Sequence, residues 1–273
     1  MSLLAHWRRF FVSGTRTKID LNDMEKAGLF ALRCFGDMSD QSYWNNFYAS
    51  RQGNKHFDWF VRFEDSVEVL KPYLPPVSHS FVTRILEIGC GTSDFSLKLF
   101  EHLNRDCRID CIDFSHEAIK TLRKIVEERG LVAKEIVETE GKLESSLDLT
   151  GLACHQADAK NMPFADETFS LALDKGTSDA VLKGPIGEGA FAEVLRECLR
   201  VLKPCGKLIQ FSDEPPELRL DALEKFKNDL AQSHSTTLNS LTLRLSWREL
   251  DTRSSFQHYL YVVHKKGVGM DKI

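Results

Sequence analysis

The spacing of hydrophobic residues changes near residue 80. Before that point, the stretch 41–76 is crowded with aromatic side chains and closed by Pro75 and Pro76, which predicts two helices. After it, short apolar runs alternate with longer stretches of helical character. The apolar runs read, in chain order, RILEIGC, RIDCIDFS, LACHQAD, FSLALDKG and GKLIQFS. This alternation predicts βαβ units and therefore a parallel sheet.

The C-terminal part departs from this alternation. A helix is expected near LRLDALEKFKNDLAQ, and the next two apolar runs, LTLRLSWREL and SFQHYLYVVHKK, are joined by a short connection. Two such strands are expected to pair antiparallel at the edge of the sheet. The polar stretch 131–150 is interpreted as a surface insertion. We therefore expect one α/β domain over residues 81–273, preceded by an N-terminal helical extension over residues 20–80.

Composition and charge narrow the classes of function. Hydrophobic residues at 42% and charged residues at 28% are typical of an ordinary globular chain. The formal net charge of −4 argues against a nucleic-acid partner, because no basic domain stands out. No apolar run approaches the roughly 18 residues that span a bilayer, so no membrane segment is expected.

The seven cysteines are interpreted as buried, reduced thiols. Cys107 and Cys111 have the spacing of a metal-binding pair, but they lie in CRIDCID, which is predicted to be a strand. Four residues along a strand cover about 13 Å, which is too far for both thiols to bind one zinc ion. No metal is therefore predicted.

The first nineteen residues carry arginines on an amphipathic pattern. Arg8, Arg9 and Arg16 precede the first acidic residue, Asp20, and the aliphatic and aromatic residues fall on one helical face. An acid-poor, arginine-bearing amphipathic start is typical of a mitochondrial transit peptide. Residues 1–19 are therefore predicted to direct import into the mitochondrial matrix. The alternative is a basic tail without a targeting role.

The first predicted strand of the alternating region leads into a glycine-containing loop, LEIGCGTSDF. Gly89 and Gly91 allow the backbone to approach a ligand closely, and the helix that follows favours a negatively charged group at its N-terminus. A dinucleotide-binding loop would have a third small residue where Asp94 stands. Glu87, just before the glycines, suits a ligand that also carries positive charge. The alternative is a tight strand-to-helix turn.

Three further strands are predicted to end in a carboxylate. Asp113 ends CIDFS, at the position where an acidic side chain accepts hydrogen bonds from ribose hydroxyls in nucleotide-binding sheets. Asp158 ends the next strand, where it could accept from an adenine amino group, and Asp174 ends the fourth. A single carboxylate at a strand end is ordinary turn chemistry. Four neighbouring strand ends in register, including the one with Glu87, predict a binding site in the crevice outside them.

The set as a whole resembles the seven-stranded S-adenosylmethionine-dependent methyltransferases, over roughly residues 40–265. The resemblance implies a Rossmann-like seven-stranded fold, a mostly parallel sheet with an antiparallel C-terminal strand pair. S-adenosylmethionine is the implied cofactor. The implied contacts are Glu87, Gly89 and Gly91 to its methionine part, Asp113 to the ribose, and Asp158 with Ala159 to the adenine. Ser93 departs from the pattern, because many members have a third glycine there.

The stretch DKGTSDA after the fourth strand narrows the resemblance. Enzymes that methylate DNA bases or glutamine amides carry Asn or Asp followed by Pro-Pro and an aromatic residue at this place. DEPPE at 213–217 does not qualify, because it follows the fifth strand and lacks the aromatic residue. DKGT together with FDWF, CGTS and the segment around DEPPELRL resembles protein-lysine methyltransferases, among them enzymes that modify translation elongation factors and mitochondrial citrate synthase.

The resemblance implies a protein substrate, with a lysine of citrate synthase as the expected acceptor. Alternatives are an elongation-factor lysine, a small-molecule acceptor, or a cofactor-binding protein without activity. Asp174 is predicted to be the catalytic residue that guides the target amine, the alternative being a contact to the ammonium group of the cofactor. Lys175 is either a solvated turn charge or a partner of a nearby carboxylate. Trp59 and Phe60 either line the substrate entrance or belong to the core.

Overall fold

The computed structural model describes most of the chain between residues 37 and 266. The described ranges are 37–51, 56–76, 82–133, 150–232, 243–251 and 257–266. The predicted transit peptide at 1–19 lies outside them, as do residues 134–149, which make up most of the predicted insertion.

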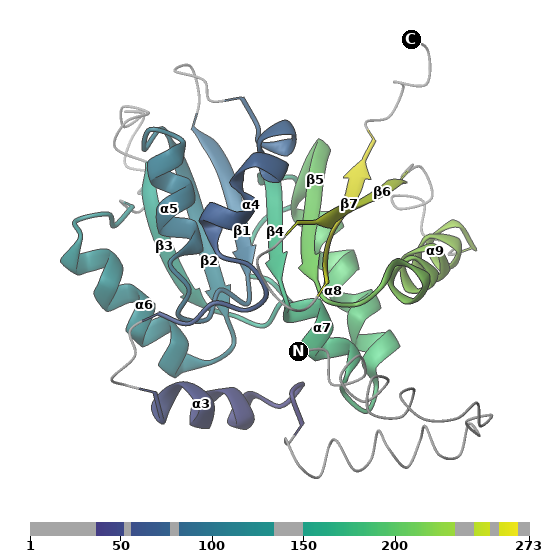
Figure 1. The fold of residues 1–273 in the computed structure, drawn as a ribbon, viewed down its shortest axis with the longest axis horizontal. Helices are drawn as coiled ribbons and strands as arrows, with labels where there is room; N and C mark the ends of the chain where they lie inside the picture. Colours follow the sequence, from purple (N-terminus) through teal and green to yellow (C-terminus); the bar gives the residue numbers. More distant parts are fainter. Residues whose placement is uncertain are drawn as a thin grey trace.

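A seven-stranded sheet organises the described residues, with the order β3-β2-β1-β4-β5-β7-β6 (Figure 1). The first five strands pair in parallel, whereas β7 pairs antiparallel with both β5 and β6. The predicted fold, a mostly parallel sheet with an antiparallel C-terminal pair, is therefore confirmed. The strands are β1 (Thr83–Ile88), β2 (Cys107–Asp113), β3 (Gly151–Gln156), β4 (Phe169–Lys175), β5 (Leu202–Ser212), β6 (Leu243–Leu250) and β7 (His258–Lys265).

Helices cover both faces of the sheet. Alternate residues of a strand point to opposite faces, so Ile85 of β1 packs in one hydrophobic cluster and Leu86 in the other. The first cluster contains residues of α4, α5 and α6, and the second contains residues of α8 and α9. The described helices are α3 (Gln41–Ala49), α4 (Phe63–Leu70), the short 3₁₀ helix η1 (Lys71–Tyr73), α5 (Phe95–His102), α6 (His116–Glu128), α7 (Thr177–Leu182), α8 (Gly187–Val201) and α9 (Pro216–Gln232).

Helix α3 occupies a different place from the other helices. It lies across the end of the sheet toward which the parallel strands point (Figure 1). Asp40 caps its N-terminus by accepting a hydrogen bond from the Ser42 amide at 2.9 Å, and Trp44 and Tyr48 are its buried residues. They pack against Ala118 of α6 and Ala180 of α7. The carboxyl ends of the strands are therefore roofed by a segment from far upstream in the chain.

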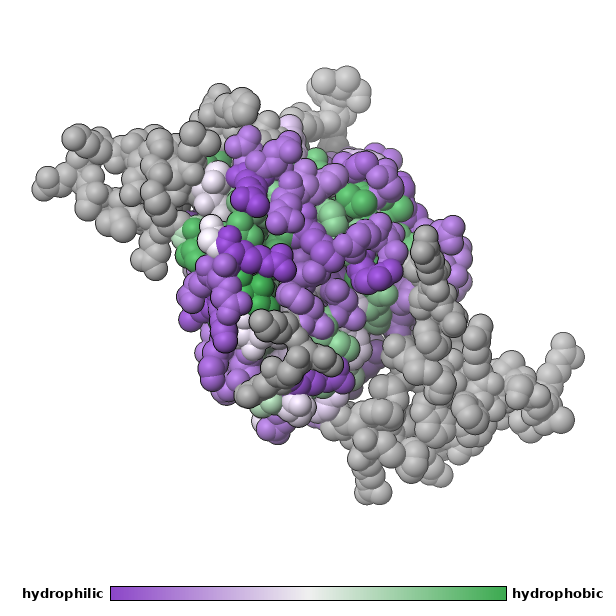
Figure 2. Space-filling view, turned by 60° about the vertical axis from the view of Figure 1, so that its left-hand side comes forward, coloured by the Kyte–Doolittle hydropathy of each residue, from purple (hydrophilic) through white to green (hydrophobic). Residues whose placement is uncertain are grey.

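The surface is mostly hydrophilic on the face shown in Figure 2, where hydrophobic residues gather only in small separate patches. Within the described ranges, no helix is both long enough and apolar enough to cross a membrane.

Candidate active site

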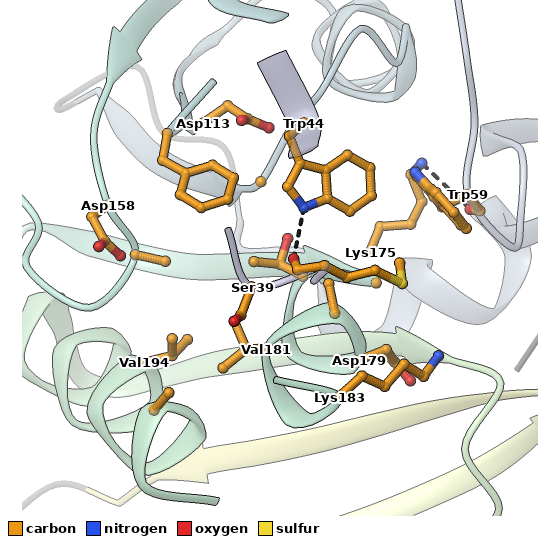
Figure 3. Close-up of a pocket in the computed structure, with 18 of the residues that line it drawn as sticks. Ser39, Trp44, Trp59, Asp113, Asp158, Lys175, Asp179, Val181, Lys183 and Val194 are labelled. Atoms are coloured by element: carbon orange, nitrogen blue, oxygen red, sulfur yellow. Dashed lines mark hydrogen bonds between the residues drawn. The ribbon is translucent and has the colours of Figure 1, made fainter. Parts of the chain in front are cut away.

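A cavity of about 400 Å³ opens at the carboxyl ends of the parallel strands, under α3. Its volume lies within the range of small-molecule sites. Figure 3 shows Asp113 and Asp158 on one side, Trp44 near the middle, and Asp179 with Lys183 on the other side. The other lining residues used below are Tyr48, Trp59, Phe60, Gly89, Ala159, Lys175, Gly176 and Thr177.

The glycine loop after β1 is held close to two neighbouring segments. Gly89 and Gly91 have positive φ angles of 59° and 54°, which side-chain-bearing residues rarely adopt. A Cβ atom on Gly89 would collide with the Thr177 hydroxyl, and one on Gly91 with the Tyr48 hydroxyl. Both positions therefore require glycine for space as well as for conformation. Gly89 lines the cavity, whereas Gly91 lies outside its lining, next to Tyr48.

Asp113 is the last residue of β2 and lines the cavity, and its carboxylate has hydrogen-bond acceptor sites that the protein does not use. One carboxylate oxygen accepts from the Gly91 amide at 2.9 Å, and the other accepts from the Ser115 amide at 2.8 Å. A carboxylate has about four acceptor sites, so about two remain for a ligand. Burial raises the pKa of Asp113 to about 6, against the lowering effect of the two amides. Near neutral pH the group is therefore an ionised acceptor.

Asp158 lies further along the same side, in the turn that follows β3. It is partly exposed, and one of its oxygens accepts from the Lys160 amide at 2.9 Å. This bond is a local turn contact and leaves the carboxylate accessible. Ala159, the next residue, also lines the cavity, so this part of the wall offers one polar and one apolar side chain to a ligand.

Glu87 lies deeper in the sheet than the sequence suggests. It is 2% exposed and is not among the cavity-lining residues. The Ser96 hydroxyl of α5 donates to its carboxylate. Burial raises its pKa to about 7, although the charge of Lys175 and the Ser96 bond both lower it. A carboxyl group with such a pKa changes charge near neutral pH.

Asp174 also lies behind the cavity wall, and its oxygens are already bonded. It is 1% exposed and accepts from the Thr177 amide at 2.9 Å and from Gln210 Nε2 at 2.9 Å. Two weaker bonds come from the Ser178 amide at 3.3 Å. Burial raises the pKa of Asp174. The carboxylate thus fixes the turn that carries Lys175, Gly176 and Thr177, all of which do line the cavity.

Lys175 has the carboxylate partner that was one of its two expected roles. Its Nζ lies 3.1 Å from Asp58 Oδ1, and its side chain is 6% exposed. Ser93 Oγ donates to the same Asp58 oxygen at 2.5 Å. Asp58 therefore connects three segments: the stretch before α4, the glycine loop and the end of β4. Its position in FDWF, next to two aromatic residues, was the only sequence signal for it.

Aromatic side chains form the roof of the cavity. Trp44 packs against Tyr48 and Trp59, with ring centroids 5.9 Å and 5.7 Å apart. Phe60 lies over Gly176, where an added Cβ would come within 2.9 Å of its ring. Phe60 also has a positive φ of 62°, an unusual conformation for an aromatic residue. Trp59 and Phe60 therefore both line the cavity and pack against other aromatic side chains, while their place at a substrate entrance stays a prediction.

The site carries no sign of a metal centre. No group of three or more His, Cys, Asp or Glu side chains is placed to hold a metal ion in the part of the chain that the structure describes. Cys107 and Cys111 are both in β2, as the sequence indicated, and are buried.

The comparison with protein families gives the class of the protein. The family described as "Methyltransferase domain" matches residues 80–251, more than half of the chain. With the seven-stranded sheet and the cavity at its carboxyl edge, this match defines an S-adenosylmethionine-dependent methyltransferase, and the chain belongs to that family.

Individual relatives narrow the class to protein-lysine methyltransferases. The mitochondrial citrate synthase-lysine N-methyltransferase of Pongo abelii is 35% identical over 203 residues, which cover 73% of this chain and 79% of that protein. EEF1A lysine methyltransferase 4 of Mus musculus is 24% identical over 82% of this chain and 74% of its own length. The chain is therefore an S-adenosylmethionine-dependent protein-lysine N-methyltransferase.

Among solved structures, geranyl diphosphate methyltransferase in complex with GPP and sinefungin has the same fold. Its TM-score is 0.51 at 13% identity, covering 83% of this chain and 98% of that one. At this identity the likeness concerns the fold alone.

Proposed function

We propose that the chain transfers methyl groups from S-adenosylmethionine to a lysine of mitochondrial citrate synthase. The observation that carries this proposal is the 35% identity to a citrate synthase-lysine N-methyltransferase over 73% of the chain. The mitochondrial matrix is the corresponding location, and the arginine-bearing start of the sequence supports it independently.

In this proposal the two acidic strand ends hold the nucleoside of the cofactor. Asp113 accepts from the ribose hydroxyls with the acceptor sites that Gly91 and Ser115 leave open. Asp158 accepts from the adenine amino group, and Ala159 packs against the adenine ring. Both residues line the same side of the cavity, so one elongated ligand can reach them together.

Glu87, Gly89 and Gly91 complete the proposed cofactor site on the methionine side. Gly89 lines the cavity, so its backbone can contact the cofactor directly. Gly91 acts through Asp113, to which its amide donates. Glu87 does not line the cavity, so in this proposal its carboxylate, to which Ser96 donates, acts through its charge on the ammonium group of the cofactor. These residues fit a ligand that carries both a carboxylate and positive charges.

When bound, S-adenosylmethionine supplies a methyl group activated by a sulfonium. The task of the chain is then to align the target amine and to remove its proton. A lysine amine has a reference pKa near 10.4, so it is mostly protonated at neutral pH. The aromatic roof of Trp44, Tyr48 and Trp59 lowers the local polarity, which favours the neutral amine.

Asp174 is proposed as the residue on which the geometry of the acceptor side depends. It fixes the turn of Lys175, Gly176 and Thr177 through bonds to the Thr177 and Ser178 amides. The sequence-based prediction that it contacts the amine itself stays a prediction. Asp174→Asn keeps the size of the side chain but replaces one acceptor oxygen with an NH2 donor, which weakens the bonds that fix this turn, and we expect a strong fall in kcat. Measuring cofactor affinity on the same variant separates the cases, since normal affinity with lost transfer places the effect on the acceptor side.

The test of the proposed function is methylation of purified citrate synthase by the full chain, scored by mass spectrometry of the lysine residues. Methylated citrate synthase is the expected result. The similarity to EEF1A lysine methyltransferase 4 supplies the competing substrate, so an elongation factor is assayed in parallel. A chain that labels the elongation factor and ignores citrate synthase would overturn the substrate. Label appearing only in metabolites of an extract would indicate a small-molecule acceptor.

A further inference from the structure

Phe60 places an aromatic ring in the cavity wall from a strained backbone. Its φ of 62° lies in the left-handed region, where a bulky side chain is a genuine outlier. Such conformations persist only where the surrounding structure fixes them, and they are concentrated at functional sites. Phe60 is partly exposed and lines the cavity. The strain therefore accompanies a ring that the protein leaves accessible to a ligand.

The order of the strands places Phe60 away from the proposed nucleoside site. Its ring lies against Gly176, which follows β4, and it packs against His258, the first residue of β7, with ring centroids 5.6 Å apart. In the sheet, β4 and β7 lie on one side of β1, whereas β2 and β3 lie on the other. Asp113 and Asp158 stand at the ends of β2 and β3. Phe60 therefore belongs to the half of the cavity that the nucleoside leaves open.

The surroundings of the Phe60 ring suit a cation. The ring planes of Trp59 and Phe60 make an angle of 69°, and both residues line the cavity, which resembles the way aromatic cages surround substituted ammonium groups. Among the described residues, no lysine or arginine lies over the Phe60 ring. Lys175, which also lines the cavity, is paired with Asp58. Burial lowers the pKa of His258, so the imidazole packed on Phe60 is neutral near neutral pH and does not repel a cation.

We propose that Phe60, with Trp59 beside it, contacts the amine nitrogen of the target lysine and stabilises the positive charge that this nitrogen gains on methylation. As the N–C bond forms and the S–C bond breaks, positive charge moves from the sulfur to the nitrogen. An aromatic ring attracts a cation through the negative charge on its face. Its apolar surface also takes the methylene groups of the lysine stem. The proposal deepens the proposed function, and it rests on lysine as the acceptor rather than on citrate synthase.

The test uses the full chain and two matched series of probes. The probes are analogues of S-adenosylhomocysteine in which nitrogen replaces sulfur and bears an alkyl arm of two, three or four carbons. In one series the arm ends in a trimethylammonium group, and in the other it ends in a tert-butyl group, which has the same shape without the charge. Calorimetry gives the preference for the cation as a ratio of dissociation constants. We expect the wild-type chain to prefer the cation by about fivefold or more at one or more arm lengths, which is the size of one contact between a cation and a ring.

Two variants of Phe60 separate the charge of the ring from its packing. A trifluorinated phenylalanine in its place keeps the shape of the ring but withdraws negative charge from its face, and Phe60→Leu removes the ring. Both should lose most of the preference for the cation and keep the affinity for S-adenosylhomocysteine. Phe57→Leu is the matched control and should keep the full preference. Phe57 belongs to the same FDWF stretch and packs against Trp59 with ring centroids 5.3 Å apart, but it is not among the cavity-lining residues.

A preference for the cation that survives the fluorinated ring overturns the proposal, as does its absence from the wild type at every arm length. An equal loss in Phe57→Leu would also overturn it, because the effect would then come from aromatic packing and not from contact with the ligand. A chain that shows the preference but ignores citrate synthase would overturn only the proposed substrate.

Discussion

Asp113 is the residue at which the cofactor side of the site is most easily tested. Asp113→Ala removes the proposed ribose contacts and also the bond that holds the Gly91 amide. Hydrogen bonds to charged groups contribute about 1.5–3 kcal/mol each, so we expect the affinity for S-adenosylmethionine to fall at least about tenfold. Calorimetry measures the affinity, and circular dichroism shows whether the variant is folded. A folded variant with unchanged affinity would place the ribose elsewhere.

Glu87 makes a second prediction, this time about stability and pH. Its pKa is raised by burial from 4.5 to about 7, so between these values the folded chain holds a proton that the unfolded chain has released. Stability is therefore lost as the pH rises through this window. The loss reaches about 3 kcal/mol at most, at about 1.4 kcal/mol per pKa unit. We expect Glu87→Gln to unfold at a higher denaturant concentration than the wild type at pH 8.

The same comparison near pH 4.5 should show little difference, because Glu87 is then largely protonated in the folded chain. It is made without cofactor, whose own charge would change the pKa. Equal unfolding midpoints for the two proteins at pH 8 would show that ionisation of the buried Glu87 carboxyl does not destabilise the fold.

Single residues also show what the sequence could and could not predict. Asp113 and Asp158 were expected at strand ends, and both line the cavity. Asp174 was expected there too, but side chains alternate along a strand, and the turn after β4 takes up its oxygens. Asp58 could not be predicted, since its contact to Lys175 joins residues 117 positions apart. Spacing along the chain carries no information on such pairs.

At the scale of elements, the carboxylate of Asp58 connects the stretch before α4 to the end of β4. Asp58→Asn would leave the ammonium of Lys175, 6% exposed, without its charged partner. Breaking a fully buried pair costs about 3–5 kcal/mol, and because Asp58 is 19% exposed we expect a smaller loss, on the order of 2 kcal/mol. Chemical denaturation measures it. Cofactor affinity should fall as well, because Trp59 and Phe60 lose their anchor.

Asp65→Asn is the matched control for this variant. It removes a carboxylate that pairs with the exposed Arg62 at 3.0 Å, three residues away on the same helix turn. Such exposed pairs contribute about 0–1 kcal/mol. Equal destabilisation by the two substitutions would show that Asp58 is an ordinary surface charge.

The helices and strands could be predicted from the sequence because the spacing of apolar residues that marks them is a local property of the chain. Apolar runs marked the strands of the parallel sheet, and the short connection between the last two runs indicated the antiparallel pair. The two helices expected in 41–76 are present as α3 and α4. The position of α3 across the strand ends was not predicted, because periodicity identifies a helix but not the surface against which it packs.

At the scale of the whole molecule, the predicted mitochondrial location rests on residues outside the described ranges. Residues 1–19 fused to a fluorescent reporter should send it to mitochondria, because the segment combines an apolar face with arginines and has no acidic residue. Replacing Arg8, Arg9 and Arg16 with serine should leave the reporter in the cytosol. A wild-type fusion that is itself cytosolic would contradict the predicted transit peptide.

The family match begins at residue 80, whereas Trp44, Tyr48 and Trp59 of the cavity roof lie before it. The part of the chain that is common to many methyltransferases therefore supplies the sheet and the floor of the site, and a separate upstream segment supplies its ceiling. Evolution can vary such a segment without disturbing any strand of the sheet. A new substrate could thus be acquired by exchanging aromatic residues upstream, provided that Tyr48 and Asp58, which contact the glycine loop, stay in place.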